Sequence, residues 1–196
     1  MAAHKPVLTG LGQRGDDGWP HDHELLAAAT GARAEDVCAL TFEAAVSPHL
    51  AAELAGVALS LGALVASARE RAAGTDALIV EGVGGLLVPL DGEHLVRDLA
   101  VALGMPLVIA ARPGLGTINH SLLTIEAART HGLDVRAVVL TPWPDDPAVL
   151  HRSNQDTIAR LGGVEVATLA HIDSLDGLAA AGAALPWRSW LGSRRM

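Results

Sequence analysis

The sequence predicts an α/β protein in which helices cover both faces of a doubly wound, mostly parallel sheet. Three short apolar runs, at 78–80, 106–111 and 135–140, have the β-branched character of strands that are buried on both faces. Helical patterns separate these runs, and the connecting loops are short. Strands that alternate with helices in this way favour a parallel sheet with right-handed crossovers.

Capping and stop residues mark the expected helices. The first begins at Asp22, as N-cap, and stops at Gly31, and the second covers 59–73 before Gly74. Further helices are expected at 95–103, 118–131, 148–161 and 173–182. The pattern also predicts the end of a strand at 5–10, a loop at 11–20, an irregular joint over 40–49 and a short strand at 164–167.

Length and composition indicate one domain that acts on small molecules. The chain has 196 residues, a mass of 20.1 kDa and a net charge of −8, which disfavours a nucleic-acid partner. No apolar run approaches the roughly 18–20 residues of a membrane span, and no signal region opens the chain. Cys38 is the single cysteine, so a disulfide framework is not indicated and we expect a cytoplasmic protein. We expect a single domain over 1–196, with a loose tail over 185–196 that carries Trp187, Trp190, Arg194 and Arg195.

A carboxylate and three glycines follow the run at 78–80. Glu81 would lie at the carboxyl end of that strand, the edge of an open α/β sheet where ligands bind. Gly82, Gly84 and Gly85 allow a ligand to approach the backbone closely. The alternative is a glycine turn with a solvated glutamate.

Lys5 is the single lysine among 14 basic residues. A compact ammonium serves phosphate as a point charge, which the planar fork of arginine does not reproduce. Lys5 is therefore a candidate for binding phosphate. The alternative is that it has no special role and remains by chance in a sequence whose composition favours arginine over lysine.

The loops that follow the strands are expected to share one sheet edge, so that 5–10, 81–85 and 112–119 converge. There Lys5 and the hydroxyl of Thr9 could contact phosphate or carboxylate oxygens, and Glu81 with Asp22 could hold Mg²⁺. The amides at 117–119 open a helix and suit an anion. Capping remains the simpler role for Asp22, and the H-D-H at 21–23 is expected to be a surface loop rather than a metal site. No G-x-x-x-x-G-K-[ST] occurs in the chain.

Four segments resemble one known family, the dethiobiotin synthetases of biotin biosynthesis. In order along the chain they are K-P-V-L-T-G at 5–10, S-P-H at 47–49, V-E-G-V-G-G at 80–85 and R-P-G-L-G-T-I-N-H at 112–120. The resemblance covers nearly the whole chain. It implies a fold of the P-loop NTPase type and an enzyme that uses ATP and Mg²⁺ to close a ureido ring on 7,8-diaminononanoate with CO₂.

The resemblance also implies roles for individual residues. Lys5 would be catalytic, and Asp22 and Glu81 would be metal ligands. The substrate would be bound by Thr9, Ser47, Pro48, Thr117, Ile118 and Asn119, the last three across a homodimer interface. The nucleotide would be bound by Glu81, Gly82, Gly84, Gly85 and Thr141.

Two departures from the family pattern stand out. The family's first strand and P-loop, of the form G-T-D-T-x-V-G-K-T, are absent from the 196 residues, and Thr141 stands where many members have an asparagine that reads adenine. We therefore expect a dethiobiotin synthetase whose natural start lies upstream of Met1. The alternatives are a P-loop-less, non-catalytic paralogue that binds a partner subunit or the diamine, and a related amidoligase or partition-type ATPase.

Overall fold

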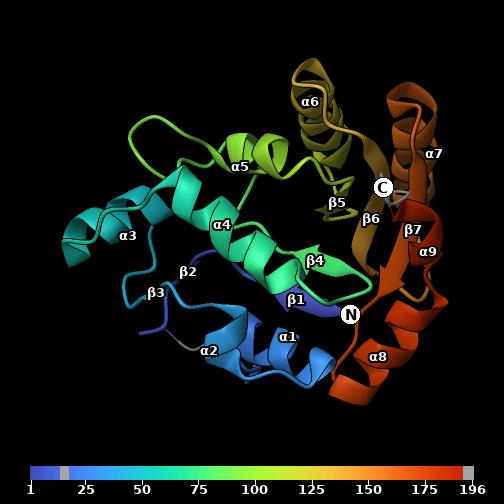
Figure 1. Ribbon diagram of the computed structural model, residues 1–196. Helices are drawn as coiled ribbons and strands as arrows, with labels where there is room; N and C mark the ends of the chain where they lie inside the picture. Colours follow the sequence, from blue (N-terminus) through green and yellow to red (C-terminus); the bar gives the residue numbers. More distant parts are fainter. Residues whose placement is uncertain (14–17, 192–196) are drawn as a thin grey trace. The chain divides into compact units, whose positions relative to one another are not determined.

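The computed structural model describes residues 1–13 and 18–191 of the chain, which fall into two compact units divided between Leu103 and Gly104 (Figure 1). Each unit combines helices with parallel strands, which confirms the predicted α/β class. Part of the predicted loop at 11–20, and Arg194 and Arg195, lie outside the described residues.

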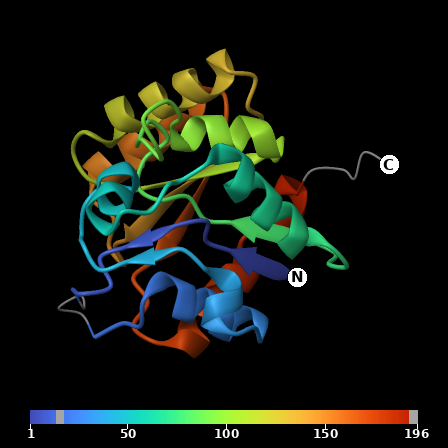
Figure 2. The same cartoon turned by 60° about the vertical axis from the view of Figure 1, so that its left-hand side comes forward.

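The first unit contains two parallel strand pairs. β1 (Ala2–His4) pairs with β4 (Leu78–Val80), and β2 (Leu8–Thr9) pairs with β3 (Thr41–Phe42). The helices of this unit are α1 (Asp22–Thr30), α2 (Ala34–Val37), α3 (Pro48–Ala55), α4 (Leu61–Ala72) and α5 (Val96–Leu103). In Figure 1 α4 runs across β1 and β4, and Figure 2 shows α1 and α2 beside β1.

The core of the first unit lies between these helices and strands. Its members include Val7, Phe42, Leu64, Leu90 and Leu99, all less than 10% exposed. Full burial of one such side chain contributes roughly 1.5–3 kcal/mol. This core fixes the chain on both sides of the β1 and β4 carboxyl ends.

The structure corrects two predictions in this unit. The segment 40–49, expected to be irregular, contains β3 and the start of α3, whose first residue is Pro48. β4 was expected to be buried on both faces, but Leu78 and Val80 are half-buried and Ile79 is 45% exposed. Within the described residues β4 pairs only with β1, and a two-stranded sheet gives its strands little cover.

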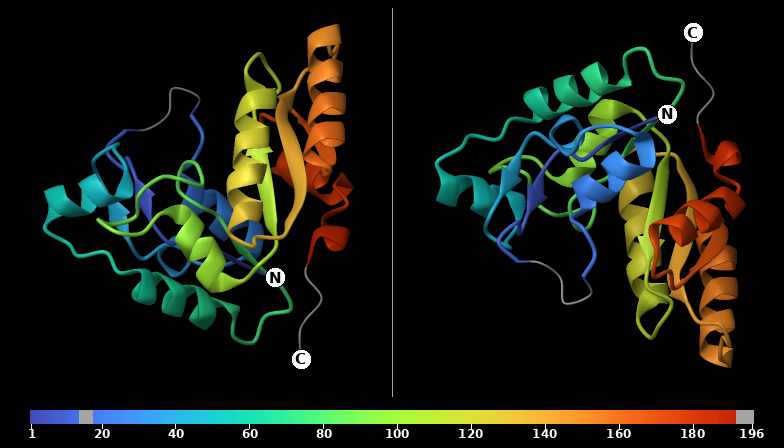
Figure 3. Two further views of the ribbon diagram at one scale, coloured as in Figure 1. Left: turned by 90° about the horizontal axis from the view of Figure 1, so that it is seen from above. Right: turned by 90° about the horizontal axis from the view of Figure 1, so that it is seen from below.

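The second unit is one three-stranded parallel sheet in the order β5 (Leu107–Ala111), β6 (Val135–Trp143), β7 (Glu165–Ala170). Its helices are α6 (Thr117–Thr130), α7 (Val149–Gly162), α8 (Leu175–Ala184) and α9 (Trp187–Trp190). Figure 3 shows α6 and α7 lying side by side along the sheet. The central strand β6 is buried on both faces, as predicted for 135–140.

Two segments of the second unit differ from expectation. β5 buries Ile109 but leaves Val108 41% exposed, because β6 is its one partner strand among the described residues. The start of the tail, expected to be loose, folds into α9. Trp190 packs on Ala137 and Val139, and its indole Nε1 donates to Glu165 Oε2 at 3.0 Å.

No described helix combines the length and the apolar character that a membrane crossing requires.

Candidate functional site

Strand register brings Lys5 and Glu81 together. β1 and β4 are parallel, with His4 opposite Val80, so the next residues, Lys5 and Glu81, leave the same edge of the pair side by side. The Glu81 amide donates to the His4 carbonyl at 2.9 Å, which continues the ladder to this point. The predicted position of Glu81 at a strand's carboxyl end is confirmed.

Lys5 is the centre of an ionic cluster. Its Nζ lies 2.6 Å from Asp22 Oδ2 and 2.6 Å from Glu81 Oε1, and a longer contact of 3.4 Å reaches the Gly82 carbonyl oxygen. The Lys5 side chain is 5% exposed, whereas those of Asp22 and Glu81 are 49% and 42% exposed. The cluster therefore has a buried cation and two carboxylates that solvent can reach.

The two carboxylates keep Lys5 charged. Burial on its own would lower the pKa of the Lys5 ammonium, but attraction and hydrogen bonds from Glu81 and Asp22 outweigh it and raise the pKa above its ordinary value. Because a raised pKa stabilises the folded state below the unfolded pKa, this contribution is lost only as the pH rises through the folded value.

Asp22 does not cap its helix, contrary to the first expectation. The N-cap of α1 is His21, whose backbone N–H donates to Glu24 Oε2 at 2.9 Å. Asp22 is the first helical residue, and its carboxylate contacts Lys5 instead. The predicted end of this helix is confirmed, since Gly31 takes a left-handed conformation with φ of 67°.

The glycine loop after Glu81 is tightly packed. Gly84 has φ of +65°, and a Cβ there would lie 3.0 Å from Val88, while a Cβ on Gly82 would lie 3.3 Å from Val96. The 86–97 segment closes on itself through Val96 N–H to Val88 O at 2.9 Å and Arg97 N–H to Leu86 O at 2.8 Å, and its Val88 amide donates to the Gly85 carbonyl at 3.0 Å. Packing therefore favours glycine at positions 82 and 84, and the left-handed backbone angle at Gly84 favours it further.

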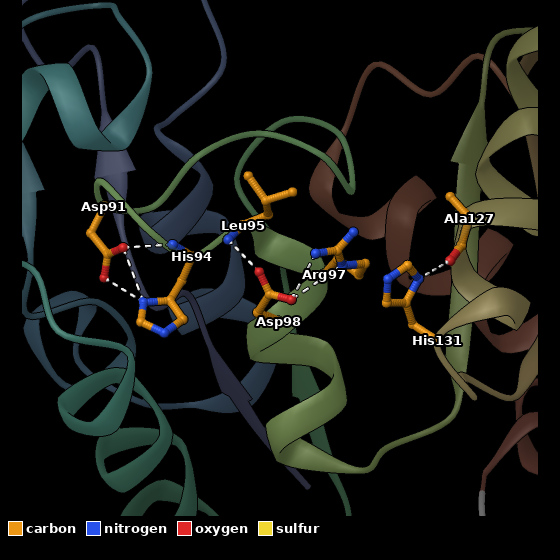
Figure 4. Close-up of polar contacts among 7 residues, drawn as sticks. All are labelled: Asp91, His94, Leu95, Arg97, Asp98, Ala127 and His131. Atoms are coloured by element: carbon orange, nitrogen blue, oxygen red, sulfur yellow. Dashed lines mark hydrogen bonds and ion pairs between the residues drawn. The ribbon is translucent and has the colours of Figure 1, made fainter.

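Two aspartates hold the turn between the glycine loop and α5 (Figure 4). Asp91 Oδ1 accepts the amides of Glu93 and His94, and the His94 ring lies 3.0 Å from both its oxygens. Asp98 Oδ2 accepts the Leu95 amide at 2.7 Å, which holds the pKa of Asp98 below its usual range. Sequence reasoning missed both aspartates, although their spacing before a helix is typical of backbone capping.

Thr9, Ser47 and Pro48 lie in the first unit with Lys5. Thr9 is at the end of β2 and is followed by Gly10, with φ of 90°, whose amide donates to Phe42 O. Ser47 is the N-cap of α3, but its side chain makes no capping hydrogen bond, and Pro48 is buried behind it. Thr9 and Ser47 are both half-buried residues.

The remaining candidates lie in the second unit. At the start of α6 the Thr117 amide donates to the Gly114 carbonyl at 3.2 Å, and its side chain is buried against Ser121. Helix geometry leaves the amides of Ile118 and Asn119 without intrahelical acceptors, so these two remain the candidates for the predicted anion site. Thr141 is a half-buried residue of β6.

Comparison with known proteins gives the same family as the four motifs. A family model described as an AAA domain matches residues 1–181. A protein of Anaeromyxobacter sp. (strain Fw109-5), named ATP-dependent dethiobiotin synthetase BioD, is 45% identical over 173 residues, 86% of this chain and 75% of the relative. The chain belongs to the ATP-dependent dethiobiotin synthetase family.

Two more distant relatives carry the same name. The protein of Anaeromyxobacter dehalogenans (strain 2CP-C) is 40% identical over 90% of this chain and 74% of its own length. That of Bacillus subtilis (strain 168) is 32% identical over 85% of this chain and 71% of its own. The predicted family resemblance is thus confirmed.

In this dethiobiotin synthetase family member the carboxylates suit a hard cation. Asp22 and Glu81 each give Lys5 one oxygen and expose about half of the side chain, and Mg²⁺ commonly takes one or two carboxylates with water and phosphate oxygens. Over residues 1–13 and 18–191 no group of three or more His, Cys, Asp or Glu side chains is placed to hold a metal. The H-D-H segment at 21–23 lies within these residues.

Asn154 is a further residue that sequence reasoning missed. It is 4% exposed on α7, and its Nδ2 donates to Pro113 O at 2.8 Å and to Gly114 O at 3.2 Å. It therefore fixes the R-P-G-L-G-T loop that leads into α6. A polar residue in the middle of a helix gives no sequence signal of such a long-range contact.

His4 is buried beside the site without a hydrogen bond. It is 3% exposed, and neither ring nitrogen has a partner among the described residues. Burial lowers the pKa of His4, the nearby Val37 carbonyl opposes the shift without forming a hydrogen bond, and the charge of Arg71 adds to it. Burial and the charge of Arg71 therefore both favour the neutral imidazole in the folded protein.

We expect the stability of the protein to fall as the pH drops below about 6.5, the ordinary histidine pKa. With a lowered folded pKa, His4 takes up its proton in the unfolded state first, so its contribution is complete above that pH and is lost below it. Thermal melts between pH 8 and pH 5 should show a smaller decline in His4→Phe, whereas the exposed control His171→Gln should behave as the parent. Equal declines in parent and His4→Phe would contradict the assignment.

Proposed function

We propose that this chain carries the active site for ATP- and Mg²⁺-dependent closure of a ureido ring on 7,8-diaminononanoate with CO₂, which gives dethiobiotin. Membership of a family whose relatives are named ATP-dependent dethiobiotin synthetase supports this function. The observation that carries it is the buried Lys5 ammonium between two accessible carboxylates at the carboxyl edge of parallel strands.

The reaction has three bond-forming steps. One amine of the substrate adds to CO₂ and loses a proton, which gives a carbamate. A carbamate oxygen attacks the γ-phosphorus of ATP, the bond to the ADP oxygen breaks, and a carbamic-phosphoric anhydride forms. The second amine then attacks the carbonyl carbon, and phosphate leaves as the ring closes.

Lys5 is the catalytic residue in this proposal. Negative charge builds up on the carbamate and on the phosphoryl group as it transfers, and an ammonium in a nearly water-free position stabilises that charge strongly. Thr9 would hydrogen-bond the same groups. Ser47 and Pro48, at the start of α3, would contact the diamine chain.

Asp22 and Glu81 would hold the metal, which neutralises phosphate charge when it is bound. Glu81 and the glycine backbone at Gly82, Gly84 and Gly85 would also border the nucleotide, and a Cβ at Gly85 would meet no atom within 4 Å, so this part of the loop is open. Thr141 would contact the base.

The carboxylate of the substrate would bind the helix start at Thr117, Ile118 and Asn119. The two free amides of Ile118 and Asn119 and the positive end of α6 suit an anion. In the arrangement that the family resemblance implies, this site faces the diamine across a homodimer interface, and we propose a homodimer in the cytoplasm.

Glu81→Gln is expected to weaken Mg²⁺-dependent nucleotide binding, because a neutral amide replaces one hard, charged ligand. The measurement is the affinity for ATP, obtained by calorimetric titration of ATP into parent and variant protein with and without Mg²⁺. It uses protein that binds nucleotide. The matched control is Glu70→Gln, an exposed glutamate on α4, which should bind as the parent does.

Identical Mg²⁺ dependence in Glu81→Gln and the parent would make Glu81 a structural residue only. A protein that binds the diamine but shows no Mg²⁺-dependent nucleotide binding in any form would favour the non-catalytic alternative.

A further inference from the structure

Each N–H donor of the Lys5 ammonium already has an acceptor within the protein. A lysine ammonium carries three N–H groups, and Asp22 Oδ2, Glu81 Oε1 and the Gly82 carbonyl oxygen lie at 2.6, 2.6 and 3.4 Å from Nζ. The side chain is also 5% exposed. In this arrangement Lys5 has no N–H left for a phosphate or carbamate oxygen.

The two carboxylates, in contrast, are paired with Lys5 but remain accessible to solvent. One oxygen of each lies 2.6 Å from the Lys5 Nζ, while nearly half of each side chain is open to solvent. A divalent cation bound to both would lie close to the Lys5 ammonium, and like charges at such separations repel strongly in a partly buried site. The pair therefore cannot serve Lys5 and a metal equally well at the same time.

We propose that Lys5 is the resident counter-ion of the Asp22–Glu81 pair and that Mg²⁺ displaces it. Asp22 and Glu81 would then hold the cation, and the ammonium of Lys5, no longer paired with them, would turn its donors toward the anionic substrate groups. Lys5 thus changes partners during the cycle, and its charge is withheld from substrate until the metal is in place. This inference rests on the proposed function for the identity of the metal ligands.

The displacement can be followed in the unmodified chain because Lys5 is its single lysine. Reductive methylation, read by fragmentation mass spectrometry, reports on Lys5 and separately on the terminal amine. We expect millimolar Mg²⁺, without nucleotide, to raise the methylation rate of Lys5 several-fold, while sodium chloride of equal ionic strength does not. An unchanged Lys5 rate in Mg²⁺ would overturn the proposal.

Substitution of Lys5 gives an independent test through metal affinity. Lys5→Met removes the charge at similar length and should bind Mg²⁺ on the order of tenfold more tightly than the parent, because the metal no longer displaces a cation. Lys5→Arg keeps the charge and should show no such gain. Equal or weaker affinity in Lys5→Met, measured on protein with a cooperative melt, would contradict the exchange.

Two carboxylate variants separate this proposal from the proposed function. If Asp22→Asn and Glu81→Gln leave Mg²⁺ affinity unchanged, the metal ligands themselves are wrongly assigned. If both variants weaken Mg²⁺ binding while Lys5 methylation and the Lys5→Met affinity stay at parent values, only the exchange is wrong.

Discussion

Lys5→Ala and Lys5→Arg are both expected to lower kcat by roughly 10²–10³-fold in the catalytically active protein, the typical effect of removing one preorganised charge contact in the transition state. Alanine removes the charge. Arginine keeps it, but its planar fork does not fit a position where one nitrogen lies 2.6 Å from two carboxylate oxygens with 5% of the side chain exposed.

The matched control is Arg33→Ala. Arg33 forms an exposed ion pair with Glu35, with 77% and 74% of the side chains accessible, and such pairs contribute little. Its kcat should equal that of the parent. Near-parental turnover in Lys5→Arg would remove Lys5 from the reaction.

A large change in hydrogen exchange is expected at the outer edge of β4. The Ala2 amide donates to the Ala77 carbonyl, and the Glu81 amide donates to the His4 carbonyl. With the parallel register of β1 and β4, these bonds show that every second residue of β4 directs its backbone N–H and C=O groups toward β1. The amides of Leu78 and Val80 therefore point to the other edge, where no strand pairs with β4 in the described part of the chain. Ile79, 45% exposed, adds apolar surface to the same strand.

A longer form of the protein, begun at an upstream in-frame start that encodes a strand and a G-x-x-x-x-G-K-[ST] loop, should slow exchange at Leu78 and Val80 by roughly 100-fold or more, because a parallel strand would bond both amides. It should also be more soluble, since unpaired strand edges promote aggregation. The buried β6 amides of Val138 and Val139 serve as internal controls and should be protected in both forms.

The opposite outcome is a 196-residue chain that is monodisperse, melts cooperatively and already protects Leu78 and Val80. That result, or an upstream frame without the loop motif, would favour the non-catalytic paralogue.

Most secondary structure could be predicted because the signals are local. Gly31 ends α1 through a backbone angle that other residues avoid, and the run at 135–140 is buried on both faces as its composition indicates. Glu81 could be placed because it directly follows an apolar strand. Lys5 could be singled out because it is the single lysine.

The rest depends on contacts between distant residues. The exposure of Ile79 follows from how many strands flank β4, which its own composition does not encode. Trp190 is buried because it reaches Glu165 and the face of β6, although a short segment near the chain end resembles a loose tail. Asp22 was predicted to cap its helix but contacts Lys5 instead, and this contact joins residues 17 positions apart in the sequence.

Incorporation of ¹³C-labelled bicarbonate into product tests the central claim most directly. In the catalytically active protein, with 7,8-diaminononanoate, ATP and Mg²⁺, we expect dethiobiotin that carries one labelled carbon in its ureido group, with one phosphate released per molecule formed. Omission of ATP, or the Lys5→Ala change, should abolish the labelled product. Phosphate release without labelled dethiobiotin, or equal product from Lys5→Ala, would contradict the account.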